Sequence, residues 1–229
     1  MYAVETRDLT KTYGGNGVET AALRGVSLKI KEKEFTSIIG PSGSGKSTLL
    51  NLIGTLDRPT SGKVFIDGVD TSELNDAELA RLRNKKIGFI FQSFNLIQRM
   101  TALMNVELPL LVTGVPVKER REMSTKWLTE LGLSEKLDHK PSQLSGGEQQ
   151  RVAVARALVT DPSIVLGDEP TGNLDTKNTS LIIDLLKRLN ETTGKTFILI
   201  THNVDVANKT ERIIRLRDGQ IESDVQVKN

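Results

Sequence analysis

The sequence has no cysteine among its 229 residues, and aromatic residues make up only 4% of it. The missing thiols exclude a disulfide framework, a thiolate zinc site and a cysteine nucleophile, and they fit a reducing compartment such as the cytosol. The scarcity of aromatic rings means that a hydrophobic core must be mainly aliphatic. A chain of this length can bury such a core without covalent or metal staples.

Long apolar runs and charge of one sign are also missing. No stretch approaches the ~20 apolar residues that cross a bilayer, and Glu5, Arg7 and Asp8 stand where a signal peptide needs apolar residues. The 31 basic and 29 acidic residues are interspersed and leave a formal charge of +2. No basic block typical of nucleic-acid binding is present. These features predict a soluble chain without a nucleic-acid partner.

Short apolar runs alternate with longer helical patterns along the chain. Runs that are apolar on both faces, as in strands inside a parallel sheet, occupy residues 36–39, 87–91, 164–166 and 197–200. Helical patterns occupy residues 46–56, 101–112, 117–131, 147–159 and 176–191. This alternation predicts an α/β fold with a mostly parallel core sheet.

Two regions depart from the alternation. The first ~30 residues and residues 63–67 alternate polar and apolar positions, which is typical of half-exposed antiparallel strands. Asp218-Gly219 predicts a turn between two final strands, as Asp67-Gly68 predicts a turn earlier in the chain. Residues 94–157 carry only helical patterns. We therefore expect a helical subdomain at 94–157, inserted into a core formed by residues 1–93 and 158–229.

A glycine-rich motif follows the first predicted core strand and opens a predicted helix. Glycines let backbone N–H groups surround phosphate oxygens, and the helix N-terminus adds a favourable dipole. Lys46 is expected to reach the β- and γ-phosphates, and the Ser47 hydroxyl to ligate Mg²⁺. The motif that predicts this phosphate site is Gly40-Pro41-Ser42-Gly43-Ser44-Gly45-Lys46-Ser47-Thr48.

Polar side chains follow three other predicted strands where those strands end. Asp168 is placed to hold Mg²⁺ through water, and Glu169 to orient or deprotonate an attacking water. His202 can point into the same crevice and contact a γ-phosphate, and the amide of Gln92 can ligate Mg²⁺. Each residue alone has an ordinary structural alternative, as a turn, a cap or a solvated side chain. The phosphate motif upstream favours the functional interpretation.

A second helix start also offers backbone donors to an anion. Ser145 can cap the helix that begins there, and Gly146 and Gly147 leave N–H groups exposed. Simple helix capping is the alternative. A second phosphate-binding face on an inserted subdomain predicts a composite site, in which one copy of the chain covers the nucleotide held by another. Symmetric dimers are the commonest way to build such a site.

These motifs, in this order and spacing, resemble the ATPase subunit of ATP-binding-cassette (ABC) transporters over essentially the whole chain. The most specific segment, similar to the family signature, is Leu144-Ser145-Gly146-Gly147-Glu148-Gln149-Gln150-Arg151. The resemblance implies a P-loop NTPase (RecA-like) fold, with ATP and Mg²⁺ as cofactors. The implied roles are Tyr13 stacking on adenine, residues 40–48 as Walker A with catalytic Lys46, Gln92 in the Q-loop, Asp168 in Walker B, Glu169 as catalytic base, His202 as the switch histidine and Asp175 in the D-loop.

The signature segment is the part of the resemblance that implies a dimer. Ser145 and Gly147 would contact the γ-phosphate bound to a partner copy, with Gly146 and Glu148 in the same binding segment. Glu148 stands where the signature usually has glutamine, and Gly167 stands where Walker B usually has alanine. Two other departures are Met104, which stands where the lipoprotein-release and macrolide-export branch of the family often has glutamate, and the glycine-rich residues 14–17 directly after Tyr13.

Finer similarity points to the lipoprotein-release and macrolide-export branch of the family. The branch pairs its ATPases with membrane permeases that have few spans and large extracytoplasmic domains. The segments that carry this similarity are Gly54-Thr55-Leu56-Asp57-Arg58-Pro59-Thr60-Ser61-Gly62, Phe94-Asn95-Leu96-Ile97, Asn105-Val106-Glu107-Leu108-Pro109-Leu110 and Glu169-Pro170-Thr171-Gly172-Asn173-Leu174-Asp175.

The resemblance implies ATP-driven, head-to-tail homodimerisation and hydrolysis that power a separate integral-membrane permease, with the chain at the cytoplasmic face of the cell membrane. The loop with Phe94, Leu96, Ile97 and Met100 is a candidate seat for a permease helix, and subdomain core is the alternative for these side chains. Two other functions stay open. One is an ATPase that transmits force or a signal without moving cargo, and the other is a soluble ABC ATPase that acts on DNA or ribosomes.

Overall fold

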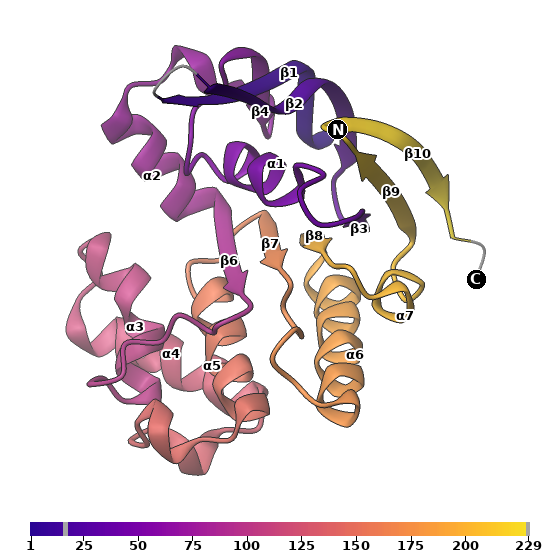
Figure 1. Ribbon diagram of the computed structural model, residues 1–229. Helices are drawn as coiled ribbons and strands as arrows, with labels where there is room; N and C mark the ends of the chain where they lie inside the picture. Colours follow the sequence, from indigo (N-terminus) through magenta and orange to yellow (C-terminus); the bar gives the residue numbers. More distant parts are fainter. Residues whose placement is uncertain (16–17, 228–229) are drawn as a thin grey trace.

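A six-stranded sheet runs through the middle of the protein in a computed structural model that describes residues 1–15 and 18–227 (Figure 1). The strand order is β10-β9-β3-β8-β7-β6, and only β10 is antiparallel to its neighbour. This confirms the predicted, mostly parallel core. The strands are β3 (Phe35–Ile39), β6 (Ile87–Phe91), β7 (Ile164–Asp168), β8 (Thr196–Ile200), β9 (Arg212–Arg217) and β10 (Gln220–Gln226).

The register of the parallel strands brings their carboxyl ends to one edge of the sheet. Phe91 of β6 pairs with Asp168 of β7, and Asp168 pairs with Ile200 of β8. Ile38 of β3 also pairs with Ile200, so β3 ends at the same level. Ligand sites of parallel α/β sheets lie at this edge. The candidate residues that follow these four strands therefore meet there.

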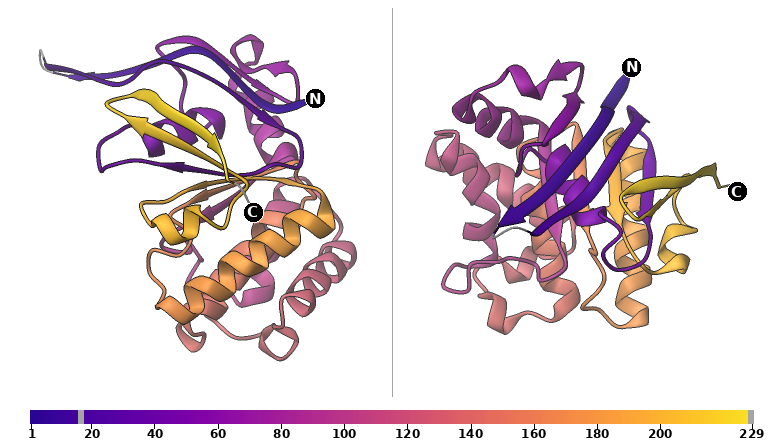
Figure 2. Two further views of the ribbon diagram at one scale, coloured as in Figure 1. Left: turned by 90° about the vertical axis from the view of Figure 1, so that its right-hand side faces the viewer. Right: turned by 45° about the horizontal axis from the view of Figure 1, so that its top comes forward.

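Both faces of this sheet are covered by apolar side chains, as the apolar runs predicted. Val165 and Leu199 belong to a core shared with the helices on one face, whereas Leu166 and Ile198 belong to a second core on the other face. Figure 2 shows these layers, with the longest helix on one side of the sheet and the antiparallel strands on the other. Each fully buried aliphatic side chain of this size contributes about 1.5–3 kcal/mol, so the two cores fix the sheet strongly.

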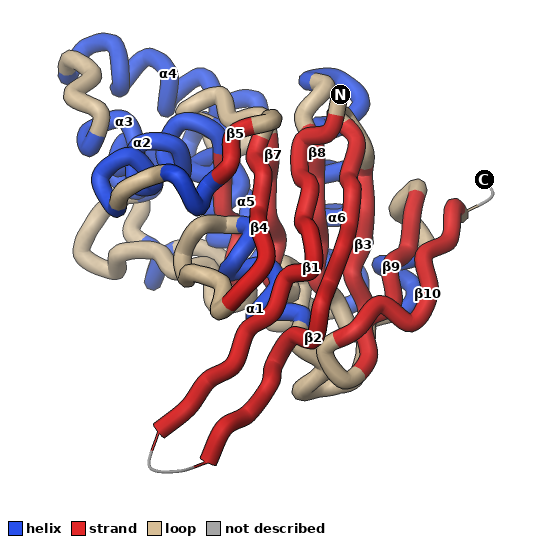
Figure 3. Tube along the Cα trace, turned by 90° about the horizontal axis from the view of Figure 1, so that it is seen from above, coloured by secondary structure: helices blue, strands red, loops and turns tan. Residues whose placement is uncertain are grey.

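A second, antiparallel sheet covers one face, with the order β2-β1-β4-β5. β1 and β2 extend side by side beyond the end of β4 (Figure 3). Gly14 and Gly15 pair with β2, whereas Asn16 and Gly17 of the same glycine-rich segment lie outside the described residues. The strands are β1 (Tyr2–Gly15), β2 (Val18–Lys31), β4 (Ser61–Ile66) and β5 (Val69–Asp70).

The helices match the predicted segments with three exceptions, one of which is the four-residue α7 (Val204–Ala207), which was not predicted. α1 ends at Ile53, three residues before the prediction, because Gly54 caps it and Thr55 turns to a φ of 53°. α2 was not predicted, since Leu79 is the only side chain that it buries. The α-helices are α1 (Lys46–Ile53), α2 (Asp76–Lys86), α3 (Ala102–Val112), α4 (Val117–Glu130), α5 (Gly146–Leu158), α6 (Thr176–Thr193) and α7 (Val204–Ala207), and the 3-10 turns are η1 (Thr71–Glu73), η2 (Ser134–Lys136) and η3 (Pro141–Gln143).

The chain between β6 and β7 contains helices and loops and no strand, consistent with an inserted helical part. Its last helix, α5, also packs closely on the core sheet. A Cβ atom at Gly88 of β6 would lie 2.1 Å from the carbonyl oxygen of Ala157 in α5, so glycine lets the helix approach the strand. The subdomain boundaries after residues 93 and 157 remain a prediction. None of the helices in the described ranges is both long and apolar enough to cross a bilayer.

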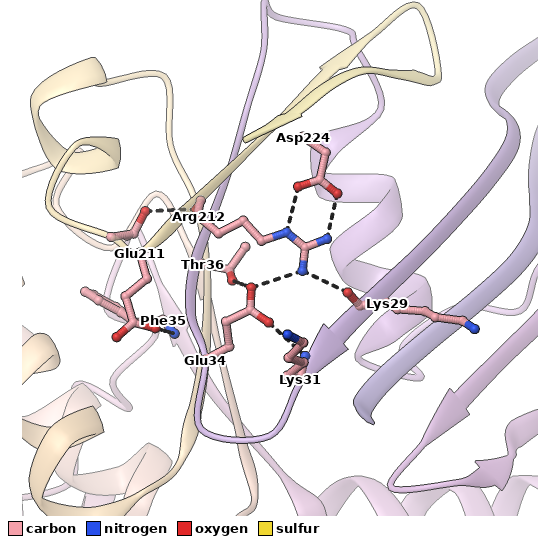
Figure 4. Close-up of polar contacts among 9 residues, drawn as sticks. Lys29, Lys31, Glu34, Phe35, Thr36, Glu211, Arg212 and Asp224 are labelled. Atoms are coloured by element: carbon pink, nitrogen blue, oxygen red, sulfur yellow. Dashed lines mark hydrogen bonds and ion pairs between the residues drawn. The ribbon is translucent and has the colours of Figure 1, made fainter. Parts of the chain in front are cut away.

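A partly buried ion-pair network fastens the C-terminal strands to the sheet (Figure 4). Arg212 of β9 donates to both carboxylate oxygens of Asp224 in β10 at 2.6 Å, and to Glu34 at 3.0 Å and the carbonyl oxygen of Lys29 at 2.8 Å. Glu34 is 8% exposed and also accepts from Thr36. The bond to Asp224, with Glu34 adding to it, raises the pKa of Arg212 further above its usual value. The guanidinium therefore stays charged and joins three strands.

Replacing Arg212 with leucine is expected to lower the free energy of unfolding by about 3 kcal/mol, because Glu34 would remain buried without a cation. Asp224→Asn, which leaves the Arg212–Glu34 pair intact, is the comparison and is expected to cost about 1 kcal/mol. Urea denaturation followed by circular dichroism measures both. Equal effects of the two variants would contradict the central position of the Arg212–Glu34 pair.

Candidate functional site

The predicted phosphate motif forms the turn between β3 and α1. Gly45, at the N-cap of α1, has a φ of 98°, and its Cβ would lie 2.4 Å from the carbonyl oxygen of Ala22, so no other residue fits. Gly40 approaches the carbonyl oxygen of Leu216 equally closely. No side chain caps α1. Its first N–H groups are therefore available to an anion.

Lys46 closes the phosphate loop on itself. Its Nζ donates to the carbonyl oxygens of Gly40 at 2.9 Å and Pro41 at 2.8 Å. The side chain is only 9% exposed, so these carbonyls replace water around the ammonium group. A triphosphate that enters the loop can take the same ammonium hydrogens, with charge assistance that the carbonyls lack.

The turn between β9 and β10 supports the loop from behind. The amide of Gly219 donates to the carbonyl oxygen of Ser44 at 3.1 Å, and the carbonyl of Gly219 accepts from the amide of Arg24 at 2.9 Å. The side chain of Ser44 is itself buried. The phosphate loop is thus held between β2 and the C-terminal hairpin.

Two carboxylates follow each other at the end of β7. Asp168 lies next to Ser47, whose Oγ donates to Oδ1 of Asp168 at 3.4 Å. Burial, and then the charge of Glu169, raise the pKa of Asp168, and Ser47 and Lys46 only partly oppose this. Negative charge at this point is incompletely neutralised, which favours a cation.

Glu169 is held against His202, which follows β8. Nδ1 of His202 lies 2.8 Å from Oε1 of Glu169. Glu169 has a φ of 47°, a left-handed conformation that is unusual for this residue type. Its amide donates to the carbonyl of Ile200 at 3.0 Å, and its carbonyl accepts from the amide of Gly172 at 2.9 Å. Backbone bonds on both sides therefore maintain the turn that presents the carboxylate.

Gly167, the departure from alanine in β7, has a packing reason. A Cβ at this position would lie 2.7 Å from Cδ2 of Leu199 in β8 and 3.3 Å from Cγ of Pro170. These two side chains fill the space that an alanine would need. The glycine changes the packing under Glu169 and removes no functional side chain.

A cavity of 480 Å³ at this edge brings Tyr13, most of the phosphate loop, Glu169 and His202 together, and Asp168 is not part of its lining. It contains ring, hydroxyl, ammonium, carboxylate and imidazole groups in one space open to solvent. Its volume is that of a small-molecule site. The lining consists of Tyr13, Ala22, Ser42, Gly43, Gly45, Lys46, Ser47, Thr48, Glu169, Ile200 and His202.

Tyr13 of β1 forms the outer wall of this cavity and is 43% exposed. Its hydroxyl donates to Oδ2 of Asp57 at 3.1 Å, and Nζ of Lys11 lies 4.9 Å from the ring centroid. Lys11 also donates to Asp57 at 2.7 Å. Burial would raise the pKa of Asp57, but the bonds from Lys11, the Arg58 amide and Tyr13 lower it overall. Asp57 thus stays charged and orients the ring.

Two of the three residues predicted to ligate Mg²⁺, Ser47 and Asp168, fit that ion. Asp168 and Ser47 offer hard oxygen donors beside the phosphate loop, and residues 1–15 and 18–227 contain no group of three or more His, Cys, Asp or Glu side chains that could hold a metal alone. Mg²⁺ typically takes one or two carboxylates and completes its shell with phosphate and water. Gln92 does not line the cavity, and its Nε2 donates to Oδ1 of Asn173 at 3.4 Å.

The second predicted anion site lies at the start of α5, and the cavity lining contains none of its residues. Ser145 accepts from the amide of Glu148 at 3.3 Å, and the Glu148 carboxylate accepts from the amide of Ser145 at 2.7 Å, which is a capping box. That backbone bond lowers the pKa of Glu148. Glu148 therefore has a structural role at the position where the signature usually has glutamine.

Asp175 caps α6 and connects it to this second site. It accepts from the amide of Asn178 at 2.8 Å and from the Asn178 side chain at 2.7 Å, and these bonds lower its pKa. A Cβ at Gly147 would lie 2.7 Å from Oδ1 of Asn178. Sequence reasoning missed Asn178, Asn173 and Asp57. Their positions could have indicated them, because all three lie in or next to residues 54–62 and 169–175, two segments that carry the family similarity.

A phosphate loop, two carboxylates at a strand end and a tyrosine ring in the lining of the cavity together define a nucleoside-triphosphate site of the P-loop type. The family profile described as ABC transporter matches residues 23–172. A Thermotoga maritima protein described as an uncharacterised ABC transporter ATP-binding protein is 53% identical over 219 residues, which is 96% of this chain and 93% of that protein. The macrolide export ATP-binding/permease protein MacB of Syntrophobacter fumaroxidans is 50% identical over 224 residues, which is 97% of this chain and 31% of that protein.

The fold is equally similar to a solved structure. A dimeric, post-hydrolysis state of the ATP-binding cassette MJ0796 of Methanocaldococcus jannaschii, bound to ADP and Pi, matches with a TM-score of 0.90 at 50% identity and covers 99% of both chains. The chain belongs to the ABC transporter family. It is the ATP-binding, ATP-hydrolysing subunit of such a transporter, and the resemblance on which the sequence prediction rested is confirmed.

Lys46→Ala is expected to raise the Kd for ATP by about 100-fold, which corresponds to about 3 kcal/mol of charge-assisted phosphate binding. Isothermal titration with a non-hydrolysable ATP analogue measures the change. The exposed Lys118 of α4 provides the matched control, Lys118→Ala. Equal affinities of Lys46→Ala and the unmodified chain would remove Lys46 from the phosphate site.

Proposed function

We propose that two copies of this chain bind two MgATP between them, head to tail. The observation that carries the proposal is the separation of two anion-binding helix starts within one chain: the cavity at α1 contains none of residues 145–148. The start of α5 therefore has no phosphate of its own to bind, and a second copy can supply one. The dimeric state described for MJ0796 supports the same arrangement.

The catalytic roles follow from the geometry around β7 and β8. Glu169 takes a proton from a water that attacks the γ-phosphorus, and the bond to the bridging oxygen breaks to give ADP and phosphate. His202, 2.8 Å from Glu169, orients that carboxylate and contacts the γ-phosphate. Lys46 binds the β- and γ-phosphates. Bound Mg²⁺ neutralises phosphate charge.

The proposed metal ligands are side chains that the fold brings to the phosphate loop. Ser47 and Asp168 hold Mg²⁺ directly or through water, as their contact indicates. Gln92 joins them after it leaves Asn173, to which it is bonded in this structure. The remaining nucleotide contacts are proposed for the ring of Tyr13, for the Walker A residues Gly40, Ser42, Gly43, Ser44, Gly45 and Thr48, and, from the partner copy, for Ser145, Gly146, Gly147, Glu148 and Asp175.

Glu169→Gln is expected to lower the ATPase kcat by about 100-fold or more, because the amide cannot accept the proton. It should keep ATP affinity and, with ATP, elute as a dimer in size-exclusion chromatography. Glu191→Gln, an exposed change at the end of α6, is the control with unchanged turnover. Rapid hydrolysis by Glu169→Gln without an ATP-dependent shift in elution would overturn both the base and the dimer.

The proposed partner is an integral-membrane permease of the lipoprotein-release or macrolide-export type, with this chain at the cytoplasmic face of the membrane. The relative MacB, whose name joins ATP-binding and permease functions, supports this. A groove of 570 Å³ between α2, β6 and α3 provides a seat for a cytoplasmic permease helix. Leu56 and Val112 line it and are 48% and 78% exposed.

The side chains of the loop expected to seat the permease differ in their exposure to solvent. Leu96 is buried in the core of the helical part, and Phe94 packs against the same core. Ile97 is exposed, as is Met104 in α3. Burial supports the core interpretation for Leu96 and Phe94, whereas the exposed Ile97 is free to contact a partner. The proposed seat includes the groove as well as Ile97.

Val112→Asp is expected to abolish co-purification with the membrane permease in detergent, because it places a charge in an apolar groove. Val225→Asp, on the exposed edge strand β10, is the matched control and should co-purify as the unmodified chain does. ATP binding checks that both variants fold. Retention of the permease by Val112→Asp would exclude the groove as its seat.

A further inference from the structure

Gln150 of α5 makes a contact that helix capping and core packing do not explain. Its side chain is fully buried, and its Nε2 donates to the carbonyl oxygen of Pro170 at 2.6 Å. Its Oε1 is also buried and has no hydrogen-bond partner in the described part of the chain. An unpartnered buried acceptor costs about 1–3 kcal/mol. Stability alone therefore gives little reason for an amide at this position.

The carbonyl that Gln150 holds belongs to the residue after Glu169. Glu169 is in the left-handed region, and a non-glycine residue there costs about 1–3 kcal/mol unless its surroundings impose the conformation. Backbone bonds to Ile200 and Gly172 impose it from β8 and from the following turn. Gln150 adds a restraint from a different element, the helix α5.

α5 begins at Gly146, one helical turn before Gln150. A helix moves as a rigid rod over one turn, so a displacement of residues 145–147 displaces the amide of Gln150 by a similar amount. The path from the start of α5 to Glu169 thus consists of one helical turn, one hydrogen bond and one peptide unit.

We infer that Gln150 is a positioning residue that couples the two nucleotide sites of the dimer. Seating of the partner's γ-phosphate on residues 145–147 fixes α5, and Gln150 then fixes the turn that presents Glu169 to this chain's own nucleotide. The inference rests on the proposed function and adds a route by which one site senses the other. In this scheme, Gln150 positions the base Glu169, whereas residues 145–147 bind the phosphate.

Gln150→Met tests this, because it keeps the length of the side chain and removes the donor. It eliminates one unpartnered acceptor, Oε1, and creates another, the Pro170 carbonyl, so the melting temperature should stay nearly constant. The ATPase kcat is expected to fall about tenfold, as a displaced catalytic group requires, while KM for ATP changes less than about twofold. The Hill coefficient for ATP should approach that of independent sites. Gln150→Leu serves the same purpose if the methionine variant does not fold.

Asn190 provides a matched control for the loss of a buried amide. It is 4% exposed and donates to the carbonyl oxygens of Lys33 at 2.8 Å and Lys195 at 2.7 Å, at the end of the sheet away from the nucleotide site. Asn190→Leu should lower the melting temperature and leave kcat, KM and the Hill coefficient unchanged. A decrease of kcat in this variant equal to that of Gln150→Met would overturn the inference.

A second measurement separates positioning from phosphate binding. In the Glu169→Gln background, Gln150→Met should leave ATP-driven dimerisation unchanged, because residues 145–147 remain in place. Loss of the dimer would overturn the inference and make Gln150 a support of the α5 start. Full turnover by Glu169→Gln alone would overturn the proposed function itself. Inactive Glu169→Gln together with unchanged kcat in Gln150→Met would overturn only the coupling.

Discussion

The parallel register of β3, β6, β7 and β8 is the constraint on which the site depends. Alternate side chains of β7 enter two different cores, Val165 on one face and Ile164 and Leu166 on the other. A slip by one residue would place each side chain in the opposite core, where the surrounding side chains are not packed to receive it. The same slip would move Asp168 and Glu169 away from the phosphate loop. Aliphatic side chains far from any nucleotide thus determine where the carboxylates lie.

The phosphate loop is preorganised by contacts from three directions. β2 lies against Gly45, β9 lies against Gly40, and the β9–β10 turn bonds to Ser44. The ion pairs of Arg212 hold that hairpin in place. A loop already in its binding conformation loses little entropy when a triphosphate enters. The buried ion pair at the edge of the sheet and the phosphate site are therefore parts of one structural unit.

The parts of the fold and the site that could be predicted are those with a local pattern in the sequence. Apolar runs located the core strands, and the phosphate motif needed only its strand–helix context. α2 was not predicted because a helix that buries Leu79 alone has no apolar stripe. Pairings between distant segments could not be predicted either: Gln92 with Asn173, and Gln150 with Pro170, join residues 81 and 20 positions apart in the sequence. Glu148 was assigned to phosphate binding from the family signature, although the spacing of Ser145 and Glu148 is also the sequence pattern of the capping box that the structure contains.

The close packing of Gly167 in β7 and Leu199 in β8 makes the residues tolerated at these two positions depend on each other. Gly167→Ala alone would force its methyl group into the leucine, and a smaller residue at position 199 alone would leave a void beneath the turn that carries Glu169. Made together, the two changes conserve volume, so their energetic effects are not additive. Whether a substitution is tolerated at either position therefore depends on the residue at the other. Either change made alone therefore alters the packing beneath the turn that carries Glu169.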